Sequence, residues 1–282
     1  PIGSLGILEE DIIKIAGIRG NASGMKLDRS ALAVMCADHG VVAEGVSQTS
    51  KDVTRIVAEN FTKGETSTSK MCRISGTDLY PVDMGMDCGP TGQKEPDMHR
   101  ILDRKVARGS GNIAREPAMS RTGCLQALLS GIDLAFRLKE KGYEILAAGE
   151  MGIGNTTTSS AVASVLLGKR AEEVTGRGAG LSSEGLQRKI RVIRQALEKN
   201  RPDPGDVLDV VAKVGGYDIA GMCGLFLGGA IYRIPVLIDG FISSVAALCA
   251  VRLAPLAGKY LFASHCSKEP GGKRVLDALG MS

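Results

Sequence analysis

Five short apolar runs in this chain each end in a small cluster of glycine with an acidic residue, a histidine or a serine. The runs are Ala31–Cys36, Leu79–Val82, Ile145–Ala148, Val236–Ile238 and Tyr260–Ala263. Their length and apolar character are typical of strands buried in a parallel sheet. Longer segments separate them, and from Leu186 to Leu197 the apolar residues recur every three or four positions, as in an amphipathic helix. This alternation predicts an α/β fold built on a mostly parallel sheet.

The composition excludes several classes of protein. The 282 residues correspond to one large domain or two small ones at roughly 150 residues per domain. Only 4% of residues are aromatic, tryptophan is absent and the net charge is +4, so we expect no nucleic-acid surface. The seven cysteines are scattered without a C-x-x-C pair, which favours a reducing compartment. No run reaches the ~18 apolar residues of a membrane span, so we expect a cytoplasmic protein without membrane contact.

The residues that follow the apolar runs are candidates for a binding site. Asp38 and His39 follow the first run, Glu150 follows the third, Asp239 the fourth and Ser264 the fifth. Open parallel sheets bind ligands at the carboxyl ends of their strands, so these residues are expected to converge on one crevice. The alternative interpretation is a set of ordinary strand-to-helix turns, in which glycine and aspartate are common.

The segment from Gly149 to Thr157 has the features of an anion site. Gly152 and Gly154 allow the backbone to approach a ligand with its N–H groups turned inward. Asn155 and Thr156 can cap a following helix, whose N-terminus attracts an anion. The chain contains no G-x-x-x-x-G-K-[ST] and no G-x-G-x-x-G, so neither an ATPase nor a standard NAD enzyme is supported. A glycine-rich turn that binds nothing is the alternative.

Other polar residues carry weaker signals. His39 is open to interpretation as a base, a metal ligand or a hydrogen-bonded loop residue, and the histidine spacing leads us to expect no metal. Cys36 is interpreted as core, because no activating pattern surrounds it. The basic segment 104–108 with the glycine-rich 109–112 is either a second anion site or a solvated turn. Lys189 lies beside the apolar face of its predicted helix, where a lysine is usually solvated. No cofactor is expected.

Seven segments together resemble a known family. They are PIGSLG (1–6), CADHGV (36–41), EGVS (44–47), GSGNIA (109–114), GEMGIGNTT (149–157), KVGG (213–216) and DGFIS (239–243). In this order they resemble the nicotinate-nucleotide:dimethylbenzimidazole phosphoribosyltransferases of cobamide lower-ligand assembly. The resemblance runs from Pro1 to Ser282, and its order and coverage make it specific.

The resemblance implies a Rossmann-like parallel sheet flanked by helices, with a small helical domain formed by the chain termini. Residues 1–20 would belong to the small domain and residues 21–282 to the large α/β domain, with the C-terminal part of the small domain largely missing. The implied reaction moves 5-phosphoribose from nicotinate mononucleotide to a lower-ligand base, giving an α-ribotide and nicotinate. The implied assembly is a homodimer, with a heterodimer of paralogues as the alternative.

The resemblance also assigns roles to individual residues. Phosphate binding is implied for Gly152, Gly154, Asn155, Thr156 and Lys189, and for Ser267, which would reach the phosphate in the neighbouring subunit's site. Ribose or nicotinate contact is implied for Glu150, Gly178 and Asp239. Glu150 is also the catalytic carboxylate expected within this chain.

Two departures from the family pattern are visible. The family's usual general base is a glutamate in an L-G-E-G-[ST]-G-A segment whose place lies beyond Ser282, so residues 1–282 are expected to bind nicotinate mononucleotide but transfer the ribosyl group poorly. In the base pocket, Thr49 and Val57 stand where relatives carry serine and glutamine. We therefore expect an apolar pocket that accepts phenols as well as dimethylbenzimidazole. The other hypotheses are a non-catalytic subunit of a heteromeric enzyme and a binding protein for a phosphorylated metabolite.

Overall fold

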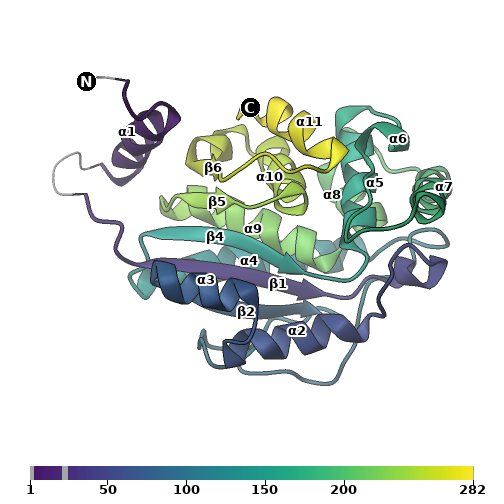
Figure 1. The fold of residues 1–282 in the computed structure, drawn as a ribbon, viewed down its shortest axis with the longest axis horizontal. Helices are drawn as coiled ribbons and strands as arrows, with labels where there is room; N and C mark the ends of the chain where they lie inside the picture. The colour runs from purple at the N-terminus through teal and green to yellow at the C-terminus, as the bar shows by residue number, and fades with distance from the viewer. Residues whose placement is uncertain (1–2, 21–24, 282) are drawn as a thin grey trace.

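The computed structural model describes residues 3–20 and 25–281 (Figure 1). Pro1 and Ile2 of the first resembling segment, residue 21 at the start of the expected large domain, and Ser282 lie outside the described residues. Within these ranges one parallel sheet has six strands: β1 (Ser30–Ala37), β2 (Thr77–Gly85), β3 (Leu102–Asp103), β4 (Ile145–Met151), β5 (Val236–Ile238) and β6 (Leu261–Ala263).

The helices between the strands account for most of the remaining chain. The α-helices are α1 (Ile7–Arg19), α2 (Asp52–Lys63), α3 (Ser67–Ser75), α4 (Arg121–Glu140), α5 (Asn155–Leu167), α6 (Ala171–Val174), α7 (Ser183–Asn200), α8 (Val207–Val214), α9 (Tyr217–Tyr232), α10 (Phe241–Leu253) and α11 (Pro270–Leu279). Two short 3₁₀ helices are η1 (Gly40–Glu44) and η2 (Pro255–Tyr260).

The strand order locates the expected ligand crevice. The strands lie in the order β3-β2-β1-β4-β5-β6, so the direction of winding reverses between β1 and β4. Ligands of open α/β sheets bind at such a reversal, beyond the carboxyl ends of the two strands. Here β1 leads to Asp38 and His39, and β4 leads to the glycine-rich turn. The order is that of a Rossmann-like sheet, and the predicted α/β fold is confirmed.

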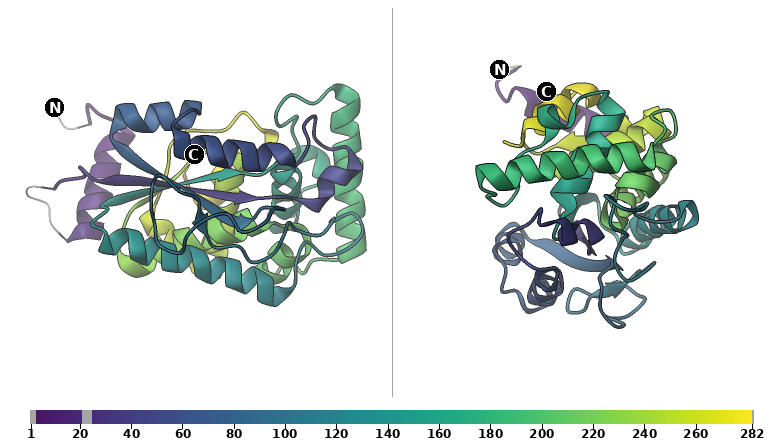
Figure 2. Two further views of the ribbon diagram at one scale, coloured as in Figure 1. Left: turned by 90° about the horizontal axis from the view of Figure 1, so that it is seen from below. Right: turned by 90° about the vertical axis from the view of Figure 1, so that its right-hand side faces the viewer.

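The sheet lies between two helical layers, which are separated clearly in the left view of Figure 2. Helices α2 and α3 pack on one face, over β1 and β2, and α4 and α9 pack on the other. Alternate residues of β1 follow this division: Ala33 and Met35 belong to the large core under α4 and α9, whereas Val34 and Cys36 belong to a smaller core under α2 and α3. Cys36 is therefore a core residue, as expected.

The five predicted strands are all present: the first three are longer by one to three residues at one or both ends, β5 has the predicted bounds, and β6 begins one residue later than predicted. The additional strand β3 has only two residues, and no apolar run marks it. Helix α9 is apolar and largely buried, and α1 lies within residues 1–20, which the family resemblance assigns to the small helical domain. Helix α1 contacts the rest of the chain near β6, where Lys14 donates to the carbonyl of Leu261 at 2.6 Å. No helix in the described part of the chain is long and apolar enough to cross a bilayer.

Candidate active site

The glycine-rich turn joins β4 to α5 at the reversal of strand order. Gly152 lies so close to β1 that a Cβ atom would stand 2.6 Å from the carbonyl oxygen of Ala37. Gly154 has φ +98°, a conformation that favours glycine, and a Cβ there would stand 2.8 Å from Val42. Both glycines are thus required by the path of the backbone. The turn directs the N-terminus of α5, which begins at Asn155, toward a cavity that it lines.

A buried cation lies beside the first turn of α5. Lys189 of α7 is fully buried, and its Nζ donates to Oγ1 of Thr156 at 2.8 Å and to the carbonyl of Gly176 at 3.2 Å. Burial lowers the pKa of Lys189 to about 8, although the charge of Glu269 acts in the opposite direction. The alternative of a solvated lysine on the helix surface is therefore wrong. The structure brings Lys189 and Thr156 together, as the phosphate assignment requires.

The segment from Gly176 to Gly178 lies beside Thr156 and Lys189. Gly178 has φ +54°, and its N–H donates to Oε1 of Glu269 at 3.0 Å. A Cβ at Gly178 would stand 3.0 Å from Oγ1 of Thr156 and 3.5 Å from Nζ of Lys189. Gly178 is thus adjacent to the proposed phosphate residues. The carboxylate of Glu269, a residue that the sequence did not single out, also lies beside Gly178.

Glu150 is the residue that two cavities share. One cavity of about 330 Å³ is lined by the glycine-rich turn, Thr156, Thr49 and Arg177. The other, of about 570 Å³, lies on the sheet face beside α3 and is largely apolar. Glu150 and Asp239 stand at its polar end. Burial and the charge of Asp218 raise the pKa of Glu150 to about 7, so this carboxyl group titrates near neutrality.

A chain of buried polar side chains leads away from Glu150. Nδ2 of Asn155 donates to Oε2 of Glu150 and also to Oδ2 of Asp218, the latter at 3.1 Å. The same Asp218 oxygen lies 3.1 Å from Nε2 of His39. His39 is buried and hydrogen-bonded in the loop after β1, in agreement with one of the interpretations of this residue.

Two findings here differ from the sequence reasoning. The Asn155 carboxamide, assigned to phosphate, is held between two carboxylates in this structure. Asp218 was not singled out, although one signal was present: it is the single charged residue in the apolar helix α9. A lone carboxylate in an otherwise apolar helix has to be paired when it is buried.

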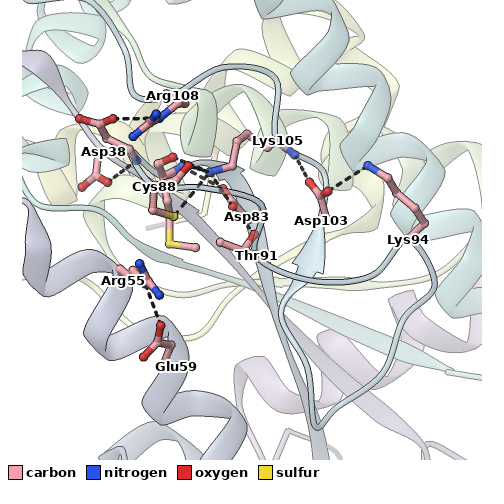
Figure 3. A network of polar contacts seen from close by, with 12 residues as sticks. Asp38, Arg55, Glu59, Asp83, Cys88, Thr91, Lys94, Asp103, Lys105 and Arg108 are labelled. Carbon is pink, nitrogen blue, oxygen red and sulfur yellow. Dashed lines mark hydrogen bonds and ion pairs between the residues drawn. The ribbon is translucent and has the colours of Figure 1, made fainter.

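The basic segment 104–108 is neutralised by acidic residues of the same chain, and Figure 3 shows part of this network. Lys105 lies 3.1 Å from the buried Asp83 and also donates to the carbonyls of Met86 and Cys88. Arg108 lies 3.4 Å from Asp87. These contacts fix the loop that follows β2. They favour a structural turn over a second anion site.

Comparison with known proteins identifies the family. A family model described as "Phosphoribosyltransferase" matches residues 1–282. A nicotinate-nucleotide–dimethylbenzimidazole phosphoribosyltransferase of Acetivibrio thermocellus is 50% identical over 280 residues, covering 99% of this chain and 78% of that protein. The corresponding protein of Ruminiclostridium cellulolyticum is 48% identical over 100% of this chain and 78% of its own length. The chain belongs to this phosphoribosyltransferase family.

A solved structure agrees with this assignment. The crystal structure of CobT from Thermus thermophilus superposes on this chain with a TM-score of 0.93 at 40% identity, covering 100% of this chain and 83% of the other. The resemblance that the seven sequence segments indicated is therefore confirmed. The chain is a phosphoribosyltransferase-family enzyme with the parallel sheet of its solved relative.

Thr49, Val57 and Ser267, the other residues that the family resemblance assigns to the site, lie in different parts of the structure. Thr49 is exposed and lines the cavity of the glycine-rich turn. Val57 is half-buried on α2 and packs against the smaller core, and it is not part of either cavity lining described above. Ser267 lies between β6 and α11, where its Oγ accepts from the N–H of Glu269 at 3.3 Å. The structure thus joins Thr49 to the turn and leaves Val57 apart.

Proposed function

We propose that this chain transfers the 5-phosphoribosyl group of nicotinate mononucleotide to a lower-ligand base of the dimethylbenzimidazole or phenol type, releasing nicotinate. The names of the relatives support nicotinate mononucleotide as the donor and dimethylbenzimidazole as the acceptor. One structural observation carries the proposal. A titrating carboxylate, Glu150, stands where a cavity with an anion-binding turn meets a largely apolar cavity.

The two cavities match the two parts of such a reaction. A phosphate can accept hydrogen bonds from the turn around Gly152 and Gly154, from Thr156 and from the ammonium group of Lys189. Flat aromatic rings fit the apolar cavity between β1, β4 and α3. We assign Gly178 to the ribose or nicotinate and Asp239 to the same crevice as Glu150. Ser267, from a neighbouring subunit, is proposed to complete the phosphate contacts.

The chemistry requires orientation, charge and the removal of one proton, because the attacking azole or phenol loses its N–H or O–H proton to water or to a general base as the new bond to the anomeric carbon forms. Nicotinate is bound to the ribose through its ring nitrogen as a pyridinium, so it leaves with a neutral ring nitrogen and needs no general acid. Positive charge develops at the anomeric carbon as the bond breaks. An ionised Glu150 facing the ribose stabilises that charge. This step needs the carboxylate form, so activity should rise as Glu150 ionises.

Nicotinate release, measured with and without an added base, tests the proposal. Release that depends on dimethylbenzimidazole or a phenol, with formation of the ribotide, supports the transferase. Binding of nicotinate mononucleotide without release under any of these conditions would instead favour the binding-protein hypothesis. The homodimer and the cytoplasmic location stay predictions, and sedimentation of the purified chain measures the former.

A further inference from the structure

Asp218 is a buried member of the hydrogen-bonded side chains that lead from Glu150 through Asn155 to His39. It belongs to the first turn of α9, and its side chain is fully buried. Its Oδ2 lies 3.1 Å from Nδ2 of Asn155 and 3.1 Å from Nε2 of His39. Its Oδ1 accepts from the N–H of Ile219 at 2.9 Å. All these partners hold the carboxylate in one orientation.

The hydrogen bonds around His39 suit its protonated form. Oγ1 of Thr158 donates its proton to the carbonyl of Asn155 at 3.0 Å, and it lies 3.3 Å from Nδ1 of His39. Since that proton is used, Thr158 accepts from Nδ1 while Asp218 accepts from Nε2. Both ring nitrogens thus have an acceptor, so the site suits His39 as an imidazolium, the form with two N–H donors. The carboxylate of Asp218 also raises the pKa of His39 against the effect of burial.

The amide of Asn155 has one orientation available. Its Nδ2 faces the carboxylates of both Glu150 and Asp218, which accept hydrogen bonds and, when ionised, cannot donate them. Each of the two N–H bonds is therefore directed at one carboxylate. A rotation of the amide would place its oxygen against two anions. Asp218 consequently fixes the group that holds Glu150.

We propose that Asp218, paired with His39, is a positioning residue for the phosphoribosyl transfer: it holds the Asn155 carboxamide, which in turn holds the Glu150 carboxylate at the junction of the two cavities. The proposal rests on the proposed function, because it assigns Asp218 a role through Glu150. Asp218 itself need not touch the substrate.

The pH response of Glu150 depends on the charges that face it. These are Asp218 from α9, Asp239 after β5 and His39 after β1, with the neutral Asn155 from α5. Burial and the two aspartates raise its pKa, whereas His39 and Asn155 lower it. Asp218→Asn therefore lowers the pKa of Glu150, because a negative neighbour is lost. His39→Gln raises it, because the positive charge of His39, which lowers the pKa of Glu150, is lost.

The two variants are tested by their pH profiles and by direct titration. In Asp218→Asn we expect kcat to fall about 10- to 100-fold with little change in KM for nicotinate mononucleotide, as for a displaced catalytic group. The acid limb of its profile should move down by about one pH unit, and that of His39→Gln should move up. Asp83→Asn removes a buried, cation-paired carboxylate from β2 and is the matched control, with an unmoved acid limb.

A second measurement keeps the test independent of turnover. Carboxyl ¹³C NMR of the labelled chain, with the Glu150 signal assigned by its absence in Glu150→Gln, reports the ionisation of Glu150 directly. Opposite shifts in the two variants support the proposal even if no transfer is detected, in which case only the proposed function fails. Folded variants, as judged by thermal unfolding, whose Glu150 titration and acid limb match the wild type would overturn it. The proposal would also be overturned if Asp218→Asn raised KM for nicotinate mononucleotide and left kcat unchanged.

Discussion

Nζ of Lys189 lies 2.8 Å from Oγ1 of Thr156, although the two residues belong to helices α7 and α5 and are 33 positions apart. Lys189 is fully buried with its ammonium group beside the N-terminus of α5. Burying an unpaired ammonium group is unfavourable, so we infer that an anionic ligand is its partner. Lys189→Ala should therefore weaken binding of nicotinate mononucleotide about 10- to 150-fold, the value of one charged hydrogen bond of about 1.5–3 kcal/mol. Calorimetric titration measures this, with the exposed Lys199→Ala on the same helix as the control. A change within a factor of two contradicts the phosphate assignment.

Affinity for the same ligand should decline above pH ~8. The phosphate stays doubly charged there, since its second pKa is about 6. Lys189, with its pKa lowered to about 8, loses its proton in this range, well before an ordinary lysine would. Binding isotherms between pH 7 and pH 9.5 measure the effect. An affinity that is constant over this range would show that the ammonium group does not contact the phosphate.

Glu150→Gln should reduce turnover and raise stability at pH 8. Removal of the charge costs about 100-fold or more in kcat, as for other groups that face developing charge. In the wild type the folded pKa of Glu150 is raised from 4.5 to about 7. The folded chain therefore binds the proton more tightly, and its stability falls as pH rises between these values, by about 3 kcal/mol.

Because glutamine does not titrate, the stability of Glu150→Gln should not fall in this way between pH 4.5 and pH 8. Urea unfolding at pH 4.5 and pH 8 compares the two proteins, and the exposed Glu184→Gln is the control. A variant less stable than the wild type at pH 8 would show that Glu150 is not held in an unfavourable ionised state.

Thr49 and Val57 should respond differently to substitution. Thr49 shares its cavity with Glu150, which also borders the apolar cavity assigned to the base, so Thr49→Val should change the ratio of dimethylbenzimidazole to p-cresol used in a competition assay. Val57 packs against the smaller core, so Val57→Ala should lower stability by about 1 kcal/mol and leave the ratio unchanged. A strong preference of the unaltered chain for dimethylbenzimidazole over p-cresol would count against a pocket that accepts phenols.

Gly224→Ala should destabilise the fold. A Cβ at Gly224 of α9 would stand 1.9 Å from the carbonyl oxygen of Leu128 in α4, and backbone atoms cannot move away cheaply. We expect a loss of about 2–3 kcal/mol, which outweighs the gain of up to ~1 kcal/mol in helix propensity. Gly17→Ala in α1, where a Cβ meets nothing within 4 Å, should show the gain alone. Equal melting temperatures for the two variants would refute this.

The parts of the fold that local sequence dictates were predictable. Apolar runs such as Ile145–Ala148 indicate strands because a buried parallel strand leaves no face for polar residues. Strand β3 could not be found, because its two residues are specified by pairing with β2 rather than by their own pattern. The glycine-rich turn was recognisable because its features are contiguous. Lys189 required the family resemblance, since helical spacing alone places it at the edge of an apolar face.

Residues that meet only through the tertiary fold were harder to find. Asp218 and His39 are 179 positions apart, and no local pattern links them. Glu269 reaches Gly178 from a loop 91 positions away. The sequence did show a carboxylate, Asp218, in an otherwise apolar helix. This indicates that the carboxylate has a partner but does not identify the partner.

Helix α9 crosses α4 with backbone against backbone, since a Cβ at Gly131 would stand 2.0 Å from the carbonyl oxygen of Gly221. At this separation the two helices cannot slide or rotate without losing the fit along the whole crossing. This packing therefore fixes the position of α9, including its N-terminal turn with Asp218. We therefore expect the pKa of Glu150 to respond to the packing at this crossing, which begins within one helical turn of Asp218. We expect crowding at this crossing, remote from either cavity, to be detectable as a change in the pH at which the enzyme begins to work.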